Sequence, residues 1–486
     1  MKKISLIIVS LFFFLICNSK IWYVKEGGSG IKDGSSWNNA AEDFPALLQD
    51  PTVNQNSLWS SQGRLKPGVN DTIFVARGSY SPIVIWNPCD SDSVRKVCRT
   101  SYKGKIKIYG GFSGKETTLS DRTNWTINES IINGDNHYYC LWIENQDSIH
   151  NQRSKDIVID GFTLKNGYGE GAAVRIVHNS PLLSNLNITN NVGCPILWFE
   201  NCNVDTMDRY NNKLLVYNSI ISNNVIHQEG NVNYPDNIIC FSSSNIHFMN
   251  STIVFNRHHN TNSINYIGLY LENNSYISVT NSIFYFNTCG KVYLYDILSQ
   301  PNILQFNFSD VQNSRGSLNW GFSPESDAGF NIDKDPIFMD PHNFNYMINK
   351  NSPCYNTANK AIYDTIIRSI PLPLSHFYNY DCYSNSRVYD NYLDIGACEF
   401  NPDYDLVPKY KDNISDILYN YDVEGKKLYI SKDIDYDKVL IFDLSGKCIY
   451  NNIFSDSYNV YLSRGYYILN LLKDKNIVNS FKLLIY

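Results

Sequence analysis

Charged side chains are scarce in this chain. Asp, Glu, Lys and Arg make up 18% of its 486 residues, and the formal net charge is -6. An average globular protein carries roughly 25% charged residues. The sequence has no basic stripe that could attract the phosphates of a nucleic acid. We therefore expect no nucleic-acid partner.

Long apolar segments are also scarce. One apolar run, residues 4–17, follows two lysines near the start of the chain. Its length is typical of a secretory signal and falls short of the roughly 20 residues that span a membrane. Small residues at Cys17 and Ser19 predict a signal peptide over residues 1–19. Lipid attachment to Cys17 is the weaker alternative, because Ile16 stands where a lipoprotein signal has a small residue. We expect the mature chain not to span a membrane.

Cysteine patterns typical of metal sites are absent from the sequence. None of the 12 cysteines forms a CxxC pair, and no histidine cluster has zinc-ligand spacing. Removal of Cys17 with the signal leaves an odd number, so at least one thiol lacks a partner within the chain. The candidates for disulfides are Cys89 with Cys98, which bracket a polar loop, and Cys354, Cys382 and Cys398, whose pairing stays open. We assign no metal residue and no cofactor, and leave calcium binding open.

A seven-residue segment recurs along the middle of the chain. It reads "NSIFYFN" at residues 281–287, and near copies lie at residues 160–166, 185–191, 218–224, 250–256 and 307–313. The copies start 25 to 33 residues apart, and such a period predicts stacked structural units. Each copy is rich in β-branched and aromatic residues, is bounded by Asn, Gly or Ser, and lacks a helical apolar period. These features favour short β-strands.

The last residue of every copy is Asn. Because the Asn amide both donates and accepts hydrogen bonds, Asn at the same corner of successive coils can form a ladder. The alternative is that Asn only marks turns, but the constant six-residue offset favours the ladder. Two apolar columns in the central copies predict a stacked interior. These columns are Val216, Phe248 and Val279, and Ile221, Ile253 and Phe284.

This pattern predicts an all-β fold, a right-handed parallel β-helix of the pectate-lyase-like solenoid type. The outermost copies fit less well, because Asp310 and Gln312 fall in columns that are apolar elsewhere. Three early segments, in residues 21–40, 70–80 and 105–117, contain "DGSSW", "NDTIFVARGSY" and "KIKIYGGFSGKET". They resemble the opening coils of secreted β-helix proteins found chiefly in Bacteroidetes.

Three later segments resemble the closing module called choice-of-anchor Q. They are "DPIFMDP" at 335–341, "NYMINKNSPCYNTA" at 345–358 and "DIGACEF" at 394–400. The resemblance implies a β-helix over residues 20–400, with the closing module from about residue 331. Residues 401–413 contain two prolines and mixed charge, and we interpret them as a linker.

The last part of the chain, residues 414–486, contains amphipathic strands with Gly at the turns, which predicts a small antiparallel β-sandwich. It resembles the C-terminal sorting domain of the type IX secretion system. The resemblance is carried by Asp443 and Gly446 in a D-x-x-G turn, by Leu462, Gly465 and Tyr467 in an L-x-x-G-x-Y strand, and by Lys482. It implies export across the outer membrane, a secreted or cell-surface location, and the secretion machinery as a partner.

No complete catalytic set is recognisable, and we assign no catalytic or binding residue. A polysaccharide lyase needs a basic residue beside a group or calcium ion that neutralises the uronate carboxylate. The candidates for this base are Lys165, Arg175, Arg257, His258 and His259. The alternative for the last three is that they form a solvated turn at a coil edge. Hydrolases of this fold use clustered Asp residues, whereas we interpret Asn203, Asp205 and Asp208 as part of a polar loop. For Trp86, Trp142 and Trp198 there are two interpretations, stacking on sugar rings and packing within the protein.

The sequence therefore predicts a monomeric, secreted, cell-surface protein that binds a glycan or another surface, as an adhesin does. The alternative is a polysaccharide lyase or glycoside hydrolase that acts on an acidic polysaccharide.

Overall fold

The computed structural model divides the chain into two compact units, Met1–Pro402 and Asp403–Tyr486. Each unit is considered by itself. The structure describes residues 19–44, 71–86, 106–144, 157–202, 214–227, 237–259, 268–288, 293–295, 302–369, 379–400, 419–422, 427–430, 437–443, 447–453, 458–462, 465–474 and 476–485.

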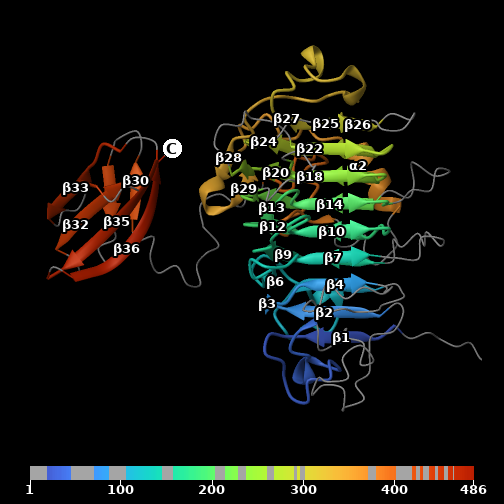
Figure 1. Ribbon diagram of the computed structural model, residues 1–486, viewed down its shortest axis with the longest axis horizontal. Helices are drawn as coiled ribbons and strands as arrows, with labels where there is room; N and C mark the ends of the chain where they lie inside the picture. Colours follow the sequence, from blue (N-terminus) through green and yellow to red (C-terminus); the bar gives the residue numbers. More distant parts are fainter. Residues whose placement is uncertain are drawn as a thin grey trace, which may run out of the picture. The chain divides into compact units, whose positions relative to one another are not determined.

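The first unit is built from stacked parallel sheets (Figure 1). The first sheet contains β1 (Ile21–Val24), β2 (Thr72–Ala76), β5 (Lys107–Phe112), β8 (Val158–Asp160), β11 (Leu182–Ser184), β15 (Leu214–Tyr217), β19 (Asn245–Met249), β23 (Tyr276–Thr280) and β26 (Ile303–Asn307). The second sheet contains β3 (Gly78–Tyr80), β6 (Ser130–Asn133), β9 (Phe162–Lys165), β12 (Asn187–Thr189), β16 (Ile220–Ser222), β20 (Thr252–Val254), β24 (Ile283–Tyr285) and β27 (Asp310–Val311).

Two further parallel sheets complete the stack. The third sheet contains β4 (Ile83–Trp86), β7 (Leu141–Glu144), β10 (Val174–Val177), β14 (Leu197–Glu200), β18 (Ile239–Ser242), β22 (Leu269–Glu272) and β25 (Tyr293–Tyr295). The short fourth sheet contains β13 (Val192–Gly193), β17 (Val225–Ile226) and β21 (Arg257–His258). The chain visits the sheets in turn, and each strand pairs with its equivalent one coil later. The predicted all-β, repeating and mostly parallel character is confirmed.

The interior of the stack is formed by equivalent apolar residues of successive coils. Val216 pairs with Phe248, which pairs with Val279. Ile221 pairs with Ile253, which pairs with Phe284. All six side chains are buried in one core cluster, so both predicted columns are confirmed. Burial of such side chains stabilises a fold by about 1.5–3 kcal/mol each.

The predicted Asn ladder is also confirmed in the central coils. Each amide Nδ2 donates to the next amide Oδ1, from Asn191 to Asn224 at 2.9 Å, from Asn224 to Asn256 at 2.8 Å, and from Asn256 to Asn287 at 2.9 Å. All four residues are buried. The Asn224 amide also donates to the Ile188 carbonyl at 3.0 Å. The ladder therefore satisfies polar groups that a buried corner would otherwise leave unpaired.

The Asn-Ser pair that opens the central copies forms a second corner. Asn218, Asn250 and Asn281 have positive φ angles of 53°, 48° and 50°, a left-handed conformation that Asn tolerates better than most residues. The Ser that follows each of them is fully buried. Ser219 N–H, for example, faces Ser251 Oγ at 3.5 Å, and Ser251 N–H donates to Ser282 Oγ at 3.1 Å. These two roles explain why Asn-Ser recurs.

The sequence alignment is wrong by one residue at both ends of the stack. Leu164 pairs with Ile188, so Gly167 rather than Asn166 occupies the ladder position, and its N–H donates to Asn191 Oδ1 at 2.8 Å. At the other end Val311 pairs with Phe284. The inward-pointing apolar residues fix the register, and Asn follows it only in the central coils. Asp310 consequently stands outside the apolar interior.

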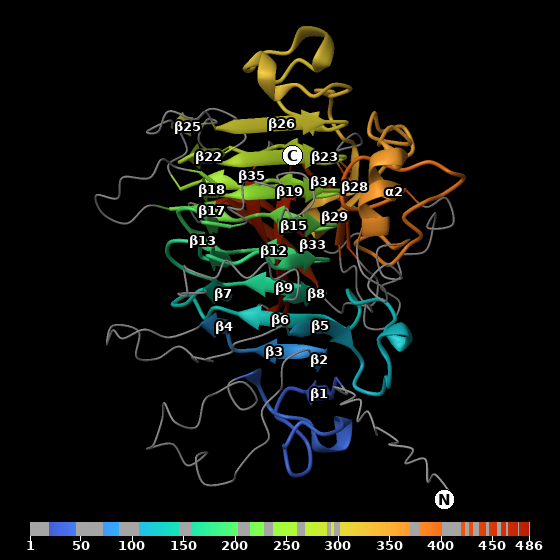
Figure 2. The ribbon, with the colours of Figure 1, turned by 90° about the vertical axis from the view of Figure 1, so that its right-hand side faces the viewer.

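A closing segment packs against the first and second sheets from outside. It contains the antiparallel hairpin of β28 (Phe338–Asp340) and β29 (Asn345–Ile348) and the helix α2 (Lys360–Ser369). Figure 2 shows α2 beside the upper coils of the stack. Tyr363 of α2 and Leu393 share a buried cluster with Tyr217 and Met249 of the first sheet. Short 3-10 turns comprise η1 (Trp37–Asn39), η3 (Leu119–Asp121), η4 (Ser317–Asn319), η5 (Pro324–Ser326) and η6 (Pro341–Asn343).

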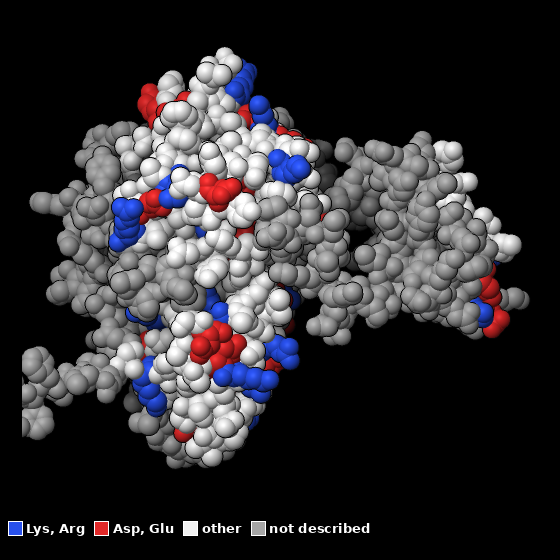
Figure 3. Space-filling view, turned by 180° about the vertical axis from the view of Figure 1, so that it is seen from behind, with Lys and Arg blue, Asp and Glu red and all other residues white. Residues whose placement is uncertain are grey.

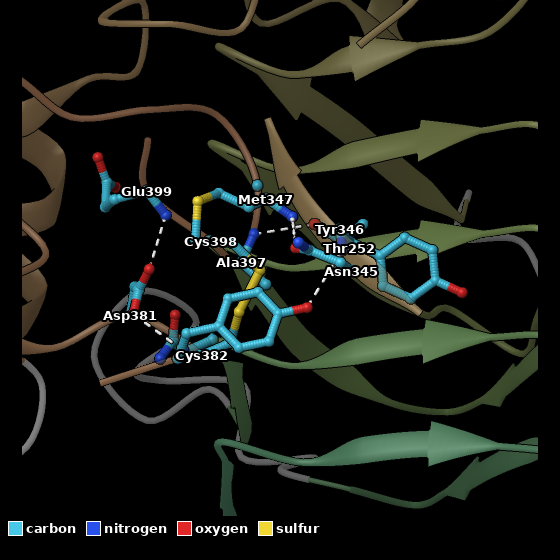
Figure 4. Close-up of a disulfide and its surroundings, with 12 residues drawn as sticks. Thr252, Asn345, Tyr346, Met347, Asp381, Cys382, Ala397, Cys398 and Glu399 are labelled. Atoms are coloured by element: carbon cyan, nitrogen blue, oxygen red, sulfur yellow. Dashed lines mark hydrogen bonds between the residues drawn. A yellow bond between two sulfur atoms is a disulfide. The ribbon is translucent and has the colours of Figure 1, made fainter. Parts of the chain in front are cut away.

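One disulfide, between Cys382 and Cys398, holds the end of the closing segment (Figure 4). Beside it, Ala397 N–H donates to Thr252 Oγ1 of β20 at 2.9 Å. Cys354 is a buried free thiol. Cys89 and Cys98 lie outside the described residues. The disulfide therefore joins the "DIGACEF" segment to Cys382 within the closing segment, and Ala397 connects the segment to the second sheet.

The second unit contains two antiparallel sheets. One comprises β30 (Tyr419–Asp422), β31 (Lys427–Ile430) and β34 (Tyr458–Asn459), and the other β33 (Cys448–Ile453), β32 (Lys438–Asp443), β35 (Gly465–Lys473) and β36 (Asn476–Ile485). Leu428 and Tyr458, from the three-stranded sheet of this unit, share a buried core with Val439, Ile441 and Leu469 from its four-stranded sheet. Among the described residues of both units, no helix has the length and apolar character needed to cross a membrane.

Candidate functional site

The basic residues singled out from the sequence lie on different sheets. Lys165 ends β9 of the second sheet, Arg175 lies in β10 of the third, and Arg257 lies in β21 of the fourth. Lys165 and Arg175 belong to one coil, whereas Arg257 lies three coils further along. The structure therefore does not bring these three residues together as one basic group.

Arg175 lies at the centre of an aromatic group on the outer face of the third sheet. It pairs in register with Trp142 on one side and Trp198 on the other. Its guanidinium carbon lies 4.7 Å from the Trp198 ring centroid, 5.9 Å from that of Trp142 and 6.0 Å from that of Tyr139. Such contacts stabilise the cation. The Arg175 side chain is 21% exposed and lies 3.8 Å from the Glu170 carboxylate.

These surroundings make Arg175 a poor general base. A guanidinium keeps its proton in proteins, so it does not abstract one from a substrate. Arg175 can instead donate hydrogen bonds from a fixed position. The arrangement suits recognition of a polar ligand better than proton abstraction.

A five-residue pattern recurs on every second strand of the third sheet. It reads "LWIEN" at 141–145, "LWFEN" at 197–201 and "LYLEN" at 269–273. The first four residues of each copy form β7, β14 and β22, which are separated by β10 and β18. The Leu and the third residue of each copy point into the core, so the aromatic residue and Glu point outward.

The aromatic residues of this pattern hold the carboxylates in place. Trp142 Nε1 donates to Glu144 Oε2 at 3.0 Å, and Tyr270 Oη donates to Glu272 Oε2 at 3.2 Å. Trp198 and Tyr270 are only 5% and 7% exposed, so their rings mainly serve packing. Glu144, Glu200 and Glu272 are half-buried. Their carboxylates form the accessible polar row.

Sequence reasoning identified Trp142, Trp198 and Arg175 but missed the three glutamates and Tyr270. Trp86 ends β4, and its side chain lies outside the described part. The signal that could have found the others is the repeated aromatic residue, apolar residue and Glu. Its copies start 56 and 72 residues apart, about two periods of the Asn repeat.

The Arg-His-His segment lies at a coil edge, as expected, but Arg257 and His258 form the short strand β21 rather than a turn. Arg257 N–H donates to the Asn224 carbonyl at 3.0 Å, and His259 N–H donates to the Ile226 carbonyl at 2.9 Å. Arg257 and His259 are exposed, and the His259 ring lies 4.6 Å from that of His227. The described residues contain no group of three potential metal ligands among His, Cys, Asp and Glu. Asn203, Asp205 and Asp208 lie outside the described residues.

Three buried acids with raised pKa values lie in the closing segment. Burial raises the pKa of Asp381, Asp394 and Glu399. The Glu399 carboxylate lies 3.2 Å from the guanidinium of Arg387, which is fully buried. Most of the other groups that donate to these acids are backbone N–H groups, as when Asp381 Oδ2 accepts from Glu399 N–H at 2.9 Å (Figure 4). The Asn385 side-chain amide also donates to Asp381 Oδ2, at 3.2 Å. No ligand can reach these groups, so their perturbation reflects structure rather than catalysis.

Arg387 also joins the closing segment to the coil stack. Its Nη1 donates to Asn218 Oδ1 at 3.4 Å. The Asn250 amide, oriented with its oxygen toward this guanidinium, accepts from Arg387 Nε at 3.0 Å. One buried cation therefore serves two successive positions of the Asn-Ser corner.

Charges on the face seen from behind are few and scattered. Figure 3 shows Lys and Arg there singly or near acidic residues, on a mostly uncharged described surface. This distribution offers no continuous basic track on that face for nucleic acid.

Comparisons with protein-family models and with curated proteins find no match to this chain. The function therefore has to be argued from the geometry of the third sheet.

Proposed function

We propose that this chain is a secreted, cell-surface protein whose residues 20–400 form a right-handed parallel β-helix that binds glycans. The observation that carries the proposal is the outer face of the third sheet. There, Arg175 is held among aromatic rings beside a row of half-buried carboxylates. Fixed polar groups on a rigid aromatic base are typical of specific ligand sites.

The assignment of handedness rests on general topology. Each coil connects parallel strands of one sheet through strands of the others. Connections between parallel strands of one sheet are right-handed in about 98% of cases. We further propose that the segment from about residue 331 is a choice-of-anchor Q module. Its motif at residues 394–400 contacts the second sheet through Ala397, which supports a role in closing the stack.

We propose that residues 414–486 are a type IX sorting domain and that residues 1–19 are a signal peptide. Two features of the second unit support this proposal. Lys447 N–H donates to Asp443 Oδ1 at 3.1 Å across the proposed D-x-x-G turn, and Tyr467 of the L-x-x-G-x-Y strand is buried in the core. The test is secretion from a host that has the type IX system. Deletion of residues 414–486 should retain the protein inside the cell, and equal export of the truncated chain would contradict the assignment.

The alternative function is cleavage of an acidic polysaccharide. It is weaker because the face that holds Arg175 also holds Glu144, Glu170, Glu200 and Glu272. These carboxylates repel uronate groups. The alternative would require a bound cation such as calcium to reverse the local charge.

One experiment separates binding from cleavage. The chain lacking the proposed signal, residues 20–486, is offered alginate, pectin, xylan and β-glucan, with and without calcium. Retardation in polysaccharide-containing gels reports binding, and the absorbance of unsaturated products together with new reducing ends reports cleavage. We expect retardation that Arg175→Ala weakens and Arg257→Ala leaves unchanged, with no product. Product formation that Arg175→Ala or Lys165→Ala abolishes would make the protein an enzyme.

A further inference from the structure

We infer that the outer face of the third sheet binds a linear, uncharged polysaccharide along the axis of the stack, with one disaccharide for every two coils. This inference rests on the glycan-binding function proposed above. It adds the class of glycan, the direction in which the glycan runs along the stack, and the number of sugars that match each coil.

The spacing of the carboxylates sets the register. Glu144, Glu200 and Glu272 occupy equivalent positions on β7, β14 and β22. Neighbouring strands lie about 4.8 Å apart, so equivalent groups two coils apart are separated by about 9.6 Å. This distance is close to the length of an extended disaccharide. A chain along the axis would therefore present an equivalent sugar to each carboxylate.

The residues between these strands support the two-coil period. Where β14 carries Trp198 and Glu200, β10 carries Arg175 and Val177 in register. Likewise β18 carries Cys240 and Ser242. Neither intervening strand has a carboxylate on this face. The polar contacts therefore alternate from coil to coil, as do the two ring orientations in an extended polysaccharide of β1,4-linked sugars.

The chemistry of each carboxylate suits sugar hydroxyls. Trp142 and Tyr270 each occupy one oxygen, Oε2, of the adjacent Glu. The remaining oxygen can accept from a hydroxyl, and a hydrogen bond to an ionised acceptor is roughly twice as strong as a neutral one. At the adjoining corner, the half-buried Asn201 and Asn273 follow Glu200 and Glu272 directly. Their amides supply both donors and acceptors.

The charge of the face selects against acidic chains. Its described residues include the carboxylates of Glu144, Glu170, Glu200 and Glu272 but only one guanidinium, that of Arg175. A uronate or sulfate polymer would meet repulsion at every second coil. A neutral polymer meets none. A polymer of cationic amino sugars would be repelled at Arg175 and attracted by the carboxylates, so the test below includes one.

The test measures binding of residues 20–486 to defined oligosaccharides by calorimetry. The probes are neutral xylo-, manno- and gluco-oligosaccharides, acidic oligogalacturonates, cationic chito-oligosaccharides and a polylysine peptide. Three sites spread over four strand spacings, about 19 Å, accommodate roughly five or six sugars. We expect affinity for one neutral series to rise up to the hexasaccharide and then to level off. Continued growth of affinity beyond eight sugars would contradict the register.

The variant Glu200→Gln/Glu272→Gln keeps the shape and removes two charges. We expect it to bind the neutral hexasaccharide at least about tenfold more weakly, because charge-assisted hydrogen bonds become neutral ones. The control is Glu325→Gln, which removes an exposed carboxylate from η5, and it should bind as the parent does. Circular dichroism verifies that all variants are folded.

The outcomes separate the inference from the function on which it rests. Neutral glycan binding that the double variant leaves unchanged would overturn the inference and leave the glycan-binding function standing. Preference for the acidic or cationic oligosaccharides would also overturn the inference and leave the glycan-binding function standing. Binding of no glycan, or of polylysine alone, would overturn both the inference and the glycan-binding function.

Discussion

Asp310 provides a quantitative test of how the closing segment docks on the coil stack. Its side chain is fully buried at the end of the second sheet. Oδ1 accepts from Lys334 N–H at 3.1 Å, and Oδ2 accepts from Cys354 Sγ at 3.3 Å. Burial, reinforced by the charges of Asp333 and Asp335, raises the pKa of Asp310 to about 8, despite the opposing hydrogen bonds.

The raised pKa implies that stability falls as pH increases. In the unfolded chain Asp310 loses its proton near pH 4, whereas in the folded chain it keeps the proton up to about pH 8. Between these values the folded state binds one more proton, so each pH unit lowers the free energy of unfolding by about 1.4 kcal/mol. The contribution is complete below pH 4 and lost above pH 8. From pH 5 to pH 7 the expected loss is about 3 kcal/mol.

The perturbation is Asp310→Asn, which resembles the protonated acid in shape and does not titrate. Its unfolding free energy, from urea titrations at pH 5, 6 and 7, is compared with that of the parent at each pH. We expect the unfolding free energy of the variant, relative to that of the parent, to rise by about 3 kcal/mol between pH 5 and pH 7. Asp390→Asn, at an exposed position, is the control and should show no such gain. A constant difference between Asp310→Asn and the parent would show that Asp310 is ionised in the folded protein.

Three further predictions concern stability. Asn191→Ala removes the acceptor of Gly167 N–H and the donor to Asn224 Oδ1. We therefore expect its free energy of unfolding in urea to fall by about 3 kcal/mol or more, whereas that of Asn190→Gly, at an exposed neighbour, should change little. Equal losses in the two variants would contradict a ladder role for Asn191. Cys382→Ser/Cys398→Ser should lower the unfolding free energy by about 3 kcal/mol, and a reducing agent that destabilises the parent should leave this variant unchanged. Gly396→Ala would place a Cβ 2.8 Å from Ile283 Cδ1 at a φ of 109°. Limited proteolysis should therefore cut the closing segment of this variant faster than that of Gly169→Ala, in which no atom lies within 4 Å of the added Cβ. Equal rates of cleavage would contradict tight docking of the closing segment.

The central coils were predictable because two patterns coincide there. The apolar column of Val216 and Phe248 and the ladder of Asn224 and Asn256 repeat with the same period. At the ends the patterns separate, and Asn166 lies beside the ladder position that Gly167 occupies. Apolar burial then fixes the register, because moving a strand by one residue would turn its inward side chains outward.

The docking of the closing segment could not be predicted in detail. The contact of Arg387 with Asn218 joins residues 169 positions apart, and nothing local in the sequence specifies it. The candidate site was predictable in part. Trp142, Trp198 and Arg175 stood out by residue type, whereas Glu200 and Glu272 gain meaning only once β14 and β22 are known to face the same side.

The distribution of loop lengths explains why a binding face belongs on the third sheet. From β11 to β27, the first and second sheets are joined in every coil by a corner of two residues, such as 218–219 and 250–251. The connection from the third sheet back to the first instead varies, from two residues between β18 and β19 to thirteen between β14 and β15. Surface loops tolerate insertions, and loops on a rigid scaffold commonly carry function. The Asn-Ser corner and the closing segment thus fix one side of the stack, which leaves the third sheet as the side where sequence can change to suit a ligand.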